Sequence, residues 1–373
     1  MTRIARTFRG ILMLLVSAPL FAGAADRIII GQAIDLSGPN AAIGRDYVAG
    51  IKTYFDAVNS KGGISGRRIQ YIVRDDQGKP ELSARLSTEL IAAENVDFLL
   101  GSVGMNSTNA ILNTQAFRRS NLVLFAPLAT ENLTDNTQVM MWRPQFQDEM
   151  RYLYSYFSKV GIKNVGLVMQ DASSHEQSLQ RISAEMQARD LNVVGIAHIG
   201  ANGERSASEA ARLAAAKPGL VLVFADSIAG GLFLKEFRTH ASQTFVAGTS
   251  LTNLETLREI AGPKAVEWTV FSQVVPNPNT YSSGIQAEHI AMMRKYRDES
   301  VSALTLEGFA VAKALVHIIE KAKNYRSAIR EFRANKNAEI DLGGLSIVNS
   351  EKMPHLSSYL DVALFRKGTR LVY

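Results

Sequence analysis

Short apolar runs alternate along this chain with longer segments in which apolar residues recur at helical spacing. The first run predicts a strand over 28–36, and a polar turn at 37–40 ends it. One face of the helix that follows is marked by apolar side chains at Ile43, Tyr47, Ile51, Phe55 and Val58. Strands that alternate with helices in this way are typical of an α/β fold with parallel sheets.

The alternation is completed twice, which predicts two doubly wound units. After the first strand, the first unit has predicted strands at 68–74, 96–100 and 122–125, with helices at 81–95 and 106–118. The second unit has predicted strands at 164–169, 193–197, 220–224, 244–247 and 269–272. Pro276 and Pro278 interrupt the pattern, and two long helices are predicted beyond them at 283–297 and 303–323. We interpret this last segment as a return crossover.

The first residues have the layout of a secretory signal peptide. Three arginines precede an apolar run over 11–21, and Ala22-Gly23-Ala24 follows it as an A-x-A cleavage site. The apolar run is too short for a transmembrane helix of about 20 residues. A retained signal anchor is the alternative, but small residues rather than more leucine follow the run. We therefore expect cleavage after Ala24 and a soluble, secreted mature chain.

Length and composition narrow the class of protein further. Removal of residues 1–24 from the 373-residue chain leaves 349 residues. A single hydrophobic core usually serves fewer residues than this, so two domains are expected. Cysteine is absent, which excludes disulfides, a thiol nucleophile, a thiolate metal site and a lipoprotein anchor. Loss of the three leader arginines lowers the formal charge from +6 to +3, too little to favour a nucleic-acid partner.

Small and polar residues follow the predicted strands where each strand ends. Ligands of open α/β sheets bind outside these carboxyl ends. The strand-end loops are 35–37, 101–104, 126–130, 170–171, 225–226 and 248–250. Such loops let a ligand reach the backbone N–H groups at helix starts, which suits an anionic or zwitterionic group.

The motifs of an enzyme are missing from these loops. Ser102 lacks the G-x-S-x-G spacing of a nucleophile elbow. Gly78-Lys79-Pro80 has the wrong neighbours for a phosphate loop, and no G-x-G-x-x-G follows the first strand. We therefore predict no enzyme activity and no cofactor, and a secreted α/β hydrolase is the alternative from another class.

Several spaced motifs occur together in one order, and they carry a resemblance to a known family. They are Gly31 to Pro39, Asn59 to Ile69, Asp75-Asp76 before Pro80, the 101–108 loop and Phe125 to Thr130. With these motifs the chain resembles the type I periplasmic solute-binding proteins of ABC importers, specifically the branched-chain amino acid, amide and urea binding family. The resemblance implies two doubly wound lobes, joined by three crossovers, that close on ligand by hinge motion. One lobe would comprise 26–144 plus 275–347, and the other 145–274 plus 348–373.

The resemblance also implies which residues of the first lobe contact ligand. Thr130 matches the family's threonine, and Leu128 lies where a backbone carbonyl accepts a ligand ammonium group. Met105 occupies the usual serine position, so only its N–H can serve there. The nearby polar residues that could substitute for the serine are Asn106, Ser107 and Thr108.

In the second lobe the resemblance implies an altered head-group site. His175 replaces the usual tyrosine, Asp226 replaces the next aromatic contact, and Thr249 or Ser250 replaces the acid that pairs with an ammonium group. Either Asp226 supplies the lost acid from a different strand, or the ligand has no ammonium group.

Each of these assignments has a structural alternative. Thr130, Asp226 and Asn106 are also residue types that cap helices, and His175 could be a solvated surface histidine. We favour ligand contact for Thr130 and, by a small margin, capping for Asp226. An aromatic cluster at 152–157 is expected in the core rather than in the cleft, since only one helical stripe faces inward.

The predicted function is therefore binding without chemistry. We expect a freely diffusing periplasmic monomer that captures a small polar solute, namely an amino acid, an amide or urea, or a carboxylate. Closure of the lobes would present the bound form to a membrane ABC permease. A periplasmic sensor that signals to a membrane receptor or kinase is the alternative within binding proteins.

Overall fold

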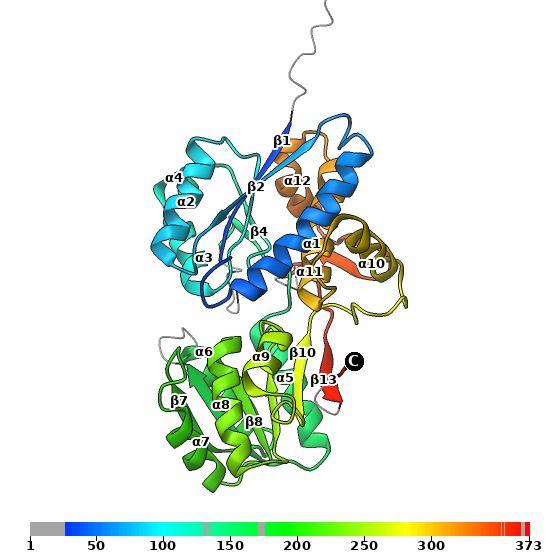
Figure 1. The fold of residues 1–373 in the computed structure, drawn as a ribbon. Coiled ribbons are helices and arrows are strands. Elements are labelled where there is room, and N and C mark those ends of the chain that lie inside the picture. Colours follow the sequence, from blue (N-terminus) through cyan, green and yellow to red (C-terminus); the bar gives the residue numbers. More distant parts are fainter. Residues whose placement is uncertain are drawn as a thin grey trace, which may run out of the picture.

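The computed structural model describes residues 27–129, 133, 136–170, 176–351, 353, 355–366 and 370–373, and for 176–179 and 370 the backbone alone. Two α/β lobes are stacked one above the other, each with its own sheet (Figure 1). We call the part built on the five-stranded sheet lobe 1, and the part built on the seven-stranded sheet lobe 2. No helix in the described ranges has both the length and the apolar character needed to cross a bilayer.

Lobe 1 has a fully parallel sheet with the strand order β2-β1-β3-β4-β5. Its strands are β1 (Ile28–Ile34), β2 (Ile69–Asp75), β3 (Phe98–Leu100), β4 (Leu124–Phe125) and β5 (Val139–Met140). Its first helices are α1 (Ala41–Ser60), α2 (Pro80–Ala92), α3 (Met105–Leu112) and α4 (Gln115–Arg119). The single helix predicted at 106–118 is wrong, because the Thr114 side chain accepts a hydrogen bond from Phe117 N–H and caps a new helix.

Lobe 2 has the strand order β14-β13-β10-β9-β8-β6-β7, and its pairings are parallel except for the two that involve β13, with β10 and with β14. The strands are β6 (Asn164–Gln170), β7 (Asn192–Ile199), β8 (Leu220–Phe224), β9 (Phe245–Gly248), β10 (Thr269–Gln273), β13 (Asp361–Arg366) and β14 (Arg370–Val372). The helices are α5 (Phe146–Lys159), α6 (Glu176–Gln187), α7 (Ser206–Ala215), α8 (Ser227–His240) and α9 (Leu254–Ala261). All five strands predicted for the second unit are confirmed.

After β10 the chain returns to lobe 1, as the proline-rich break predicts. The returning elements are α10 (Gly284–Tyr296), α11 (Ala303–Lys321), the 3₁₀ turn η1 (Tyr325–Ser327), α12 (Ala328–Ala334) and the hairpin of β11 (Ala338–Asp341) and β12 (Ser346–Asn349). The chain then crosses back and adds β13 and β14 to the lobe 2 sheet. Three crossovers thus join the lobes. The first two predicted lobe limits lie within crossovers, and the third, at 347, lies inside β12.

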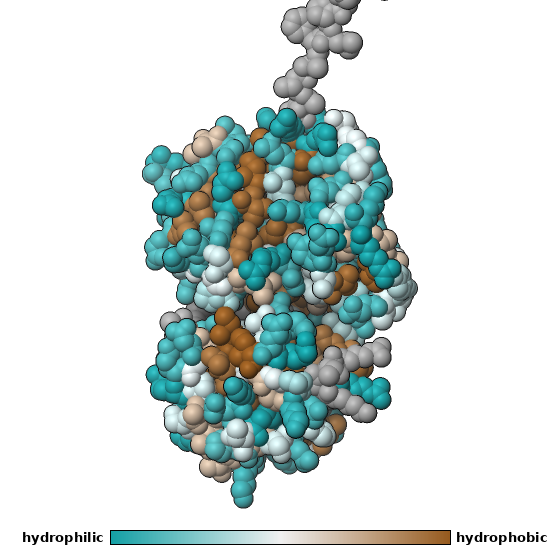
Figure 2. Space-filling model, viewed as in Figure 1, coloured by the Kyte–Doolittle hydropathy of each residue, from teal (hydrophilic) through white to brown (hydrophobic). Residues whose placement is uncertain are grey.

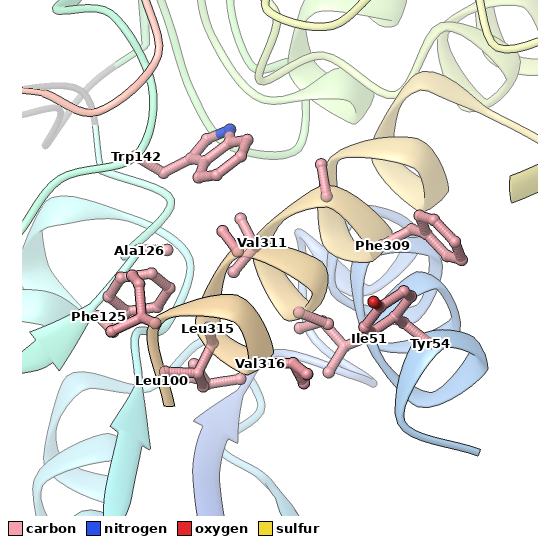
Figure 3. Close-up of a cluster of buried hydrophobic side chains, with 14 of the residues drawn as sticks. Ile51, Tyr54, Leu100, Phe125, Ala126, Trp142, Phe309, Val311, Leu315 and Val316 are labelled. Atoms are coloured by element: carbon pink, nitrogen blue, oxygen red, sulfur yellow. The ribbon is translucent and has the colours of Figure 1, made fainter. Parts of the chain in front are cut away.

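Close packing of α1 against α11 holds the returning segment in lobe 1. A Cβ atom at Gly50 would lie 1.9 Å from Thr305 O, and one at Gly308 would lie 2.1 Å from Tyr47 O. These two glycines therefore let the helix backbones touch. Val311 and Leu315 of α11 point toward the sheet residues Phe125 and Leu100, among others, in the core of lobe 1 (Figure 3).

Candidate ligand-binding cleft

The strand order identifies the waist between the lobes as the candidate ligand site. In open α/β sheets, ligands bind at the carboxyl ends of the strands where the order reverses. That point lies between β1 and β3 in lobe 1 and between β6 and β8 in lobe 2. Figure 2 shows the surface drawn inward between the two lobes.

In lobe 1, the loops after β3 and β4 are joined to each other beyond their strands. Leu128 N–H donates to Ser102 O over 3.0 Å, and Gly104 N–H donates to Leu128 O over 2.9 Å. A Cβ at Gly101 would lie 2.2 Å from Pro127 Cα, so only glycine permits this approach. The Leu128 carbonyl, predicted to accept a ligand ammonium, therefore already accepts one hydrogen bond from the protein.

The predicted serine-position residues lie at the start of α3. Met105 and Ser107 are buried, whereas the Asn106 side chain is exposed. The first helical hydrogen bond of α3 runs from Thr108 N–H to Gly104 O over 3.1 Å, so the N–H groups of residues 105–107 precede it. These backbone donors at a positive helix end are what lobe 1 offers to an anionic ligand group.

The acids at the lobe 1 strand ends serve the loops themselves. Asp35 accepts hydrogen bonds from the N–H groups of Gly38 and Asn40, over 2.5 and 2.9 Å. Asp76 accepts from the hydroxyls of Ser83 and Ser102, each over 2.7 Å, and burial raises the pKa of its carboxyl. Both carboxylates are buried and thus shape the loops that border the cleft.

In lobe 2, Asp226 joins the two strands that flank the reversal point. Its Oδ1 accepts from the N–H groups of Ile228 and Ala229, each over 2.9 Å, and so caps α8. Its Oδ2 accepts from Gln170 Nε2 over 2.8 Å, while Gln170 Oε1 accepts from Asp226 N–H over 2.9 Å. The capping alternative is therefore confirmed, and the carboxylate is already engaged on both oxygens.

The remaining predicted contacts are placed only in part. Thr130 and His175 lie outside the described residues. Thr249 is half-buried after β9, and its carbonyl accepts from Thr252 N–H over 3.2 Å. Ser250 is buried and donates its N–H to Glu149 Oε2 over 2.9 Å. The structure thus brings the 249–250 loop to the hinge side of the waist.

A buried charged cluster at the hinge was not found from the sequence. Arg143 of the first crossover binds Glu307 of α11 through two hydrogen bonds, over 3.1 and 2.6 Å, and donates to Ser250 Oγ over 3.0 Å. Burial alone would lower the pKa of Arg143, but the carboxylates of Glu307 and Glu149 outweigh it and raise that pKa. The sequence offered one signal, the single acid Glu307 within the stretch Leu304 to Ala312, in which Thr305 is the one other polar side chain.

A second contact joins the lobes on the side of α1. Asp46 Oδ2 accepts from Ser302 Oγ over 2.8 Å and from Asn253 Nδ2 over 3.5 Å. Asn253 belongs to lobe 2, where it caps α9 by accepting from Thr256 N–H. Burial raises the pKa of Asp46, and the Ser302 hydroxyl opposes that rise.

Two stacked lobes, three crossovers and facing strand ends define the class of two-lobed α/β solute-binding proteins. A model of the family described as periplasmic binding protein matches residues 27–344. The chain belongs to this family.

Named relatives agree with that assignment. The chain is 26% identical over 333 residues to Leu/Ile/Val-binding protein homolog 1 of Brucella suis, with 84% of each chain covered. It is 24% identical over 331 residues to Leu/Ile/Val-binding protein BraC3 of Rhizobium johnstonii, with 86% of this chain and 87% of that one covered. Both relatives carry the names of solute-binding proteins, not of enzymes.

Solved structures show the same fold. A substrate-binding periplasmic protein from Ralstonia solanacearum superposes with a TM-score of 0.85 at 23% identity, covering 92% of this chain and 99% of that one. The branched-chain amino acid transporter substrate-binding protein LivJ of Streptococcus pneumoniae, in complex with isoleucine, gives a TM-score of 0.81 at 18% identity, covering 93% and 99%. The type I periplasmic binding protein fold expected from the sequence is thus confirmed.

Proposed function

We propose that this protein is the periplasmic solute-binding component of an ABC importer. The observation that carries the proposal is the pair of reversal points that face each other at the waist, α3 on one side and the Gln170 and Asp226 pair on the other. A solute between them contacts both lobes and stabilises the closed form, which a membrane permease then recognises. The Leu/Ile/Val-binding names of the relatives support the same role.

The solute that we propose is a small molecule with a carboxylate or amide end. The N–H groups of 105–107 suit an anionic or carbonyl oxygen. Asp35, Asp76 and Asp226 each accept at least two hydrogen bonds from the protein, so these described acids are committed to the loops. An ammonium group is therefore not required for recognition, although amino acids, amides and urea belong in the test.

We further propose how the mature protein is organised. Cleavage after Ala24 releases a freely diffusing periplasmic monomer without enzyme activity. Its lobes are divided after residues 144 and 274, and the third limit moves from 347 to the end of β12 at 349. The hinge network around Arg143 supports this division, because it ties the first crossover to α11 of lobe 1 and to Ser250 of lobe 2.

A thermal-shift screen of the mature chain tests the proposal. The chain is refolded to remove any bound solute and is then heated with amino acids, amides, urea and carboxylates. A solute at a hundred times its Kd adds about 2.7 kcal/mol of stability, which raises Tm by a few degrees. A shift that Thr130→Ala abolishes supports the cleft assignment. A folded chain that none of these solutes shifts, and that reacts with hydrolase probes, contradicts it.

A further inference from the structure

A second cavity lies outside the cleft, on the outer side of the hinge. It is open to solvent and has a volume of about 670 Å³ between α5 and the third crossover. One helical stripe of α5 forms a wall of this cavity, and its members are Asp148, Arg151, Tyr152, Ser155, Tyr156 and Lys159. The other lining residues belong to the first and third crossovers, so the cavity is separate from the strand-end loops.

We propose that this cavity is a second small-molecule site, which takes a planar aromatic carboxylate. Its volume is in the range of ligand pockets, which is about 300–1,000 Å³. The proposal is independent of the identity of the solute in the cleft.

Two exposed tyrosines supply the aromatic surface. Tyr152 is 41% exposed and Tyr156 is 55% exposed, and both line the cavity. Tyr154 and Phe157 of the same helix are buried in the lobe 2 core, as predicted for the cluster, whereas the prediction of a core position is wrong for Tyr152 and Tyr156. Packing in the lobe 2 core therefore does not explain why large aromatic residues stand at positions 152 and 156. Large rings beside a cavity offer faces and edges on which a planar ligand packs.

The charges in the wall favour an anion. Arg151 is held by Asp148 and by Glu185, each over 2.8 Å, so its charge is already balanced. Lys159 is exposed at the last position of α5, and within the described residues it has no ion-pair partner. The ammonium group of Lys159 is therefore available to form an ion pair with a ligand carboxylate.

The opposite wall contains a buried polar group without a partner. His355 is 9% exposed and lines the cavity, and its Nδ1 has no hydrogen-bond partner among the described residues. Burial lowers the pKa of His355, with the nearby Asp148 opposing, so the imidazole is neutral at pH 7. A buried nitrogen without a partner is unusual. A polar group of a bound ligand would supply that partner.

The position of the cavity couples it to the hinge. The helix that forms its wall, α5, also carries the buried Glu149 outside the cavity lining, and Glu149 accepts hydrogen bonds from Ser250 N–H and the Ser272 hydroxyl, over 2.9 and 2.6 Å. The crossover wall pairs with the first crossover, through Leu356 N–H to Met141 O over 3.0 Å. A ligand that spans both walls therefore changes the free energy of hinge movement, and with it the affinity of the cleft for its solute.

Calorimetric titration of the mature chain with 2-naphthoate tests the proposal. Binding is expected, and Tyr156→Ala should weaken it about tenfold through loss of ring packing. Lys159→Gln should weaken the binding of 2-naphthoate but leave the binding of the uncharged 2-naphthamide unchanged. Tyr281→Ala is the matched control, since Tyr281 is 59% exposed and lies outside the cavity lining.

A cleft variant separates this proposal from the proposed function. Thr130→Ala should leave 2-naphthoate binding unchanged. If Thr130→Ala abolishes binding and Tyr156→Ala does not, the compound occupies the cleft and the hinge site is wrong. Absence of any binding heat at millimolar 2-naphthoate overturns the hinge site as well, whatever solute the cleft takes.

Discussion

Arg143 and Glu307 meet in a two-point ion pair that is almost wholly shielded from solvent, with side chains 1% and 2% exposed. The pair joins the first crossover to α11, and the third guanidinium nitrogen reaches Ser250 in lobe 2. A single side chain thus contacts the hinge and both lobes. Its removal tests how much the hinge depends on this contact.

Arg143→Met should destabilise the protein strongly. The substitution leaves the Glu307 carboxylate buried without its partner, and loss of one member of a buried pair costs about 3–5 kcal/mol. The double variant Arg143→Met with Glu307→Leu should recover part of that loss, since Glu307 then no longer places a charge in the interior, while the buried Glu149 still lacks the Arg143 charge. Urea unfolding monitored by circular dichroism measures both values.

The exposed pair of Arg74 and Glu94, at 3.0 Å, provides the control. Arg74→Met should cost less than about 1 kcal/mol, because exposed pairs contribute little. An Arg143→Met variant that is no less stable than Arg74→Met would show that the hinge pair does not hold the lobes in place.

Asp226→Ala should lower stability by about 1–2 kcal/mol, because α8 loses its N-cap. Asp226→Asn keeps an oxygen for the N–H groups of Ile228 and Ala229 and should retain most of the stability. Solute affinity should change little in Asp226→Asn, since the carboxylate is engaged within the protein. Thermal unfolding and titration with the solute found in the screen measure the two effects. A loss of affinity of a hundredfold in Asp226→Asn would instead assign the carboxylate to the ligand.

Gly50→Ala and Gly308→Ala should each destabilise the protein by about 1–3 kcal/mol, through overpacking between α1 and α11. Alanine ordinarily stabilises a helix interior relative to glycine by about 1 kcal/mol. The reverse sign is expected here because each new Cβ would meet the backbone of the other helix. Gly230→Ala in α8 is the matched control, since its Cβ would lie 3.5 Å from the nearest atom, Val223 Cγ1. Denaturant midpoints should therefore fall for the first two variants and rise for the third.

The sequence predicts the repeating strands and helices well because each carries its own local pattern. It predicts neither β5 nor the strands after residue 323, which are β11 to β14, nor the break between α3 and α4. At the site, the restriction of Met105 to its backbone N–H follows from the residue type alone, and its side chain is buried. The pair of Arg143 and Glu307 spans 164 positions, and no local pattern carries such a contact.

His289 should make the protein less stable in mild acid. The side chain is fully buried between α10 and α11, against the ring of Phe309, and neither ring nitrogen has a hydrogen-bond partner in the described ranges. Burial lowers the pKa of His289 to about 4. The unfolded chain, with a histidine pKa of about 6.5, therefore binds the proton more readily than the folded chain.

The sign follows from that difference. The stability that His289 contributes is fully present above pH 6.5 and is lost progressively as the pH falls from there toward 4, because only the unfolded state is protonated in that window. Between pH 7 and pH 5 the loss amounts to about 2 kcal/mol. His289→Leu removes the titrating group, so its unfolding free energy should fall by about 2 kcal/mol less over the same interval. Urea unfolding of both proteins at pH 7, 6 and 5 measures the difference, and parallel pH dependences in the two would show that His289 is not buried as a neutral group in solution.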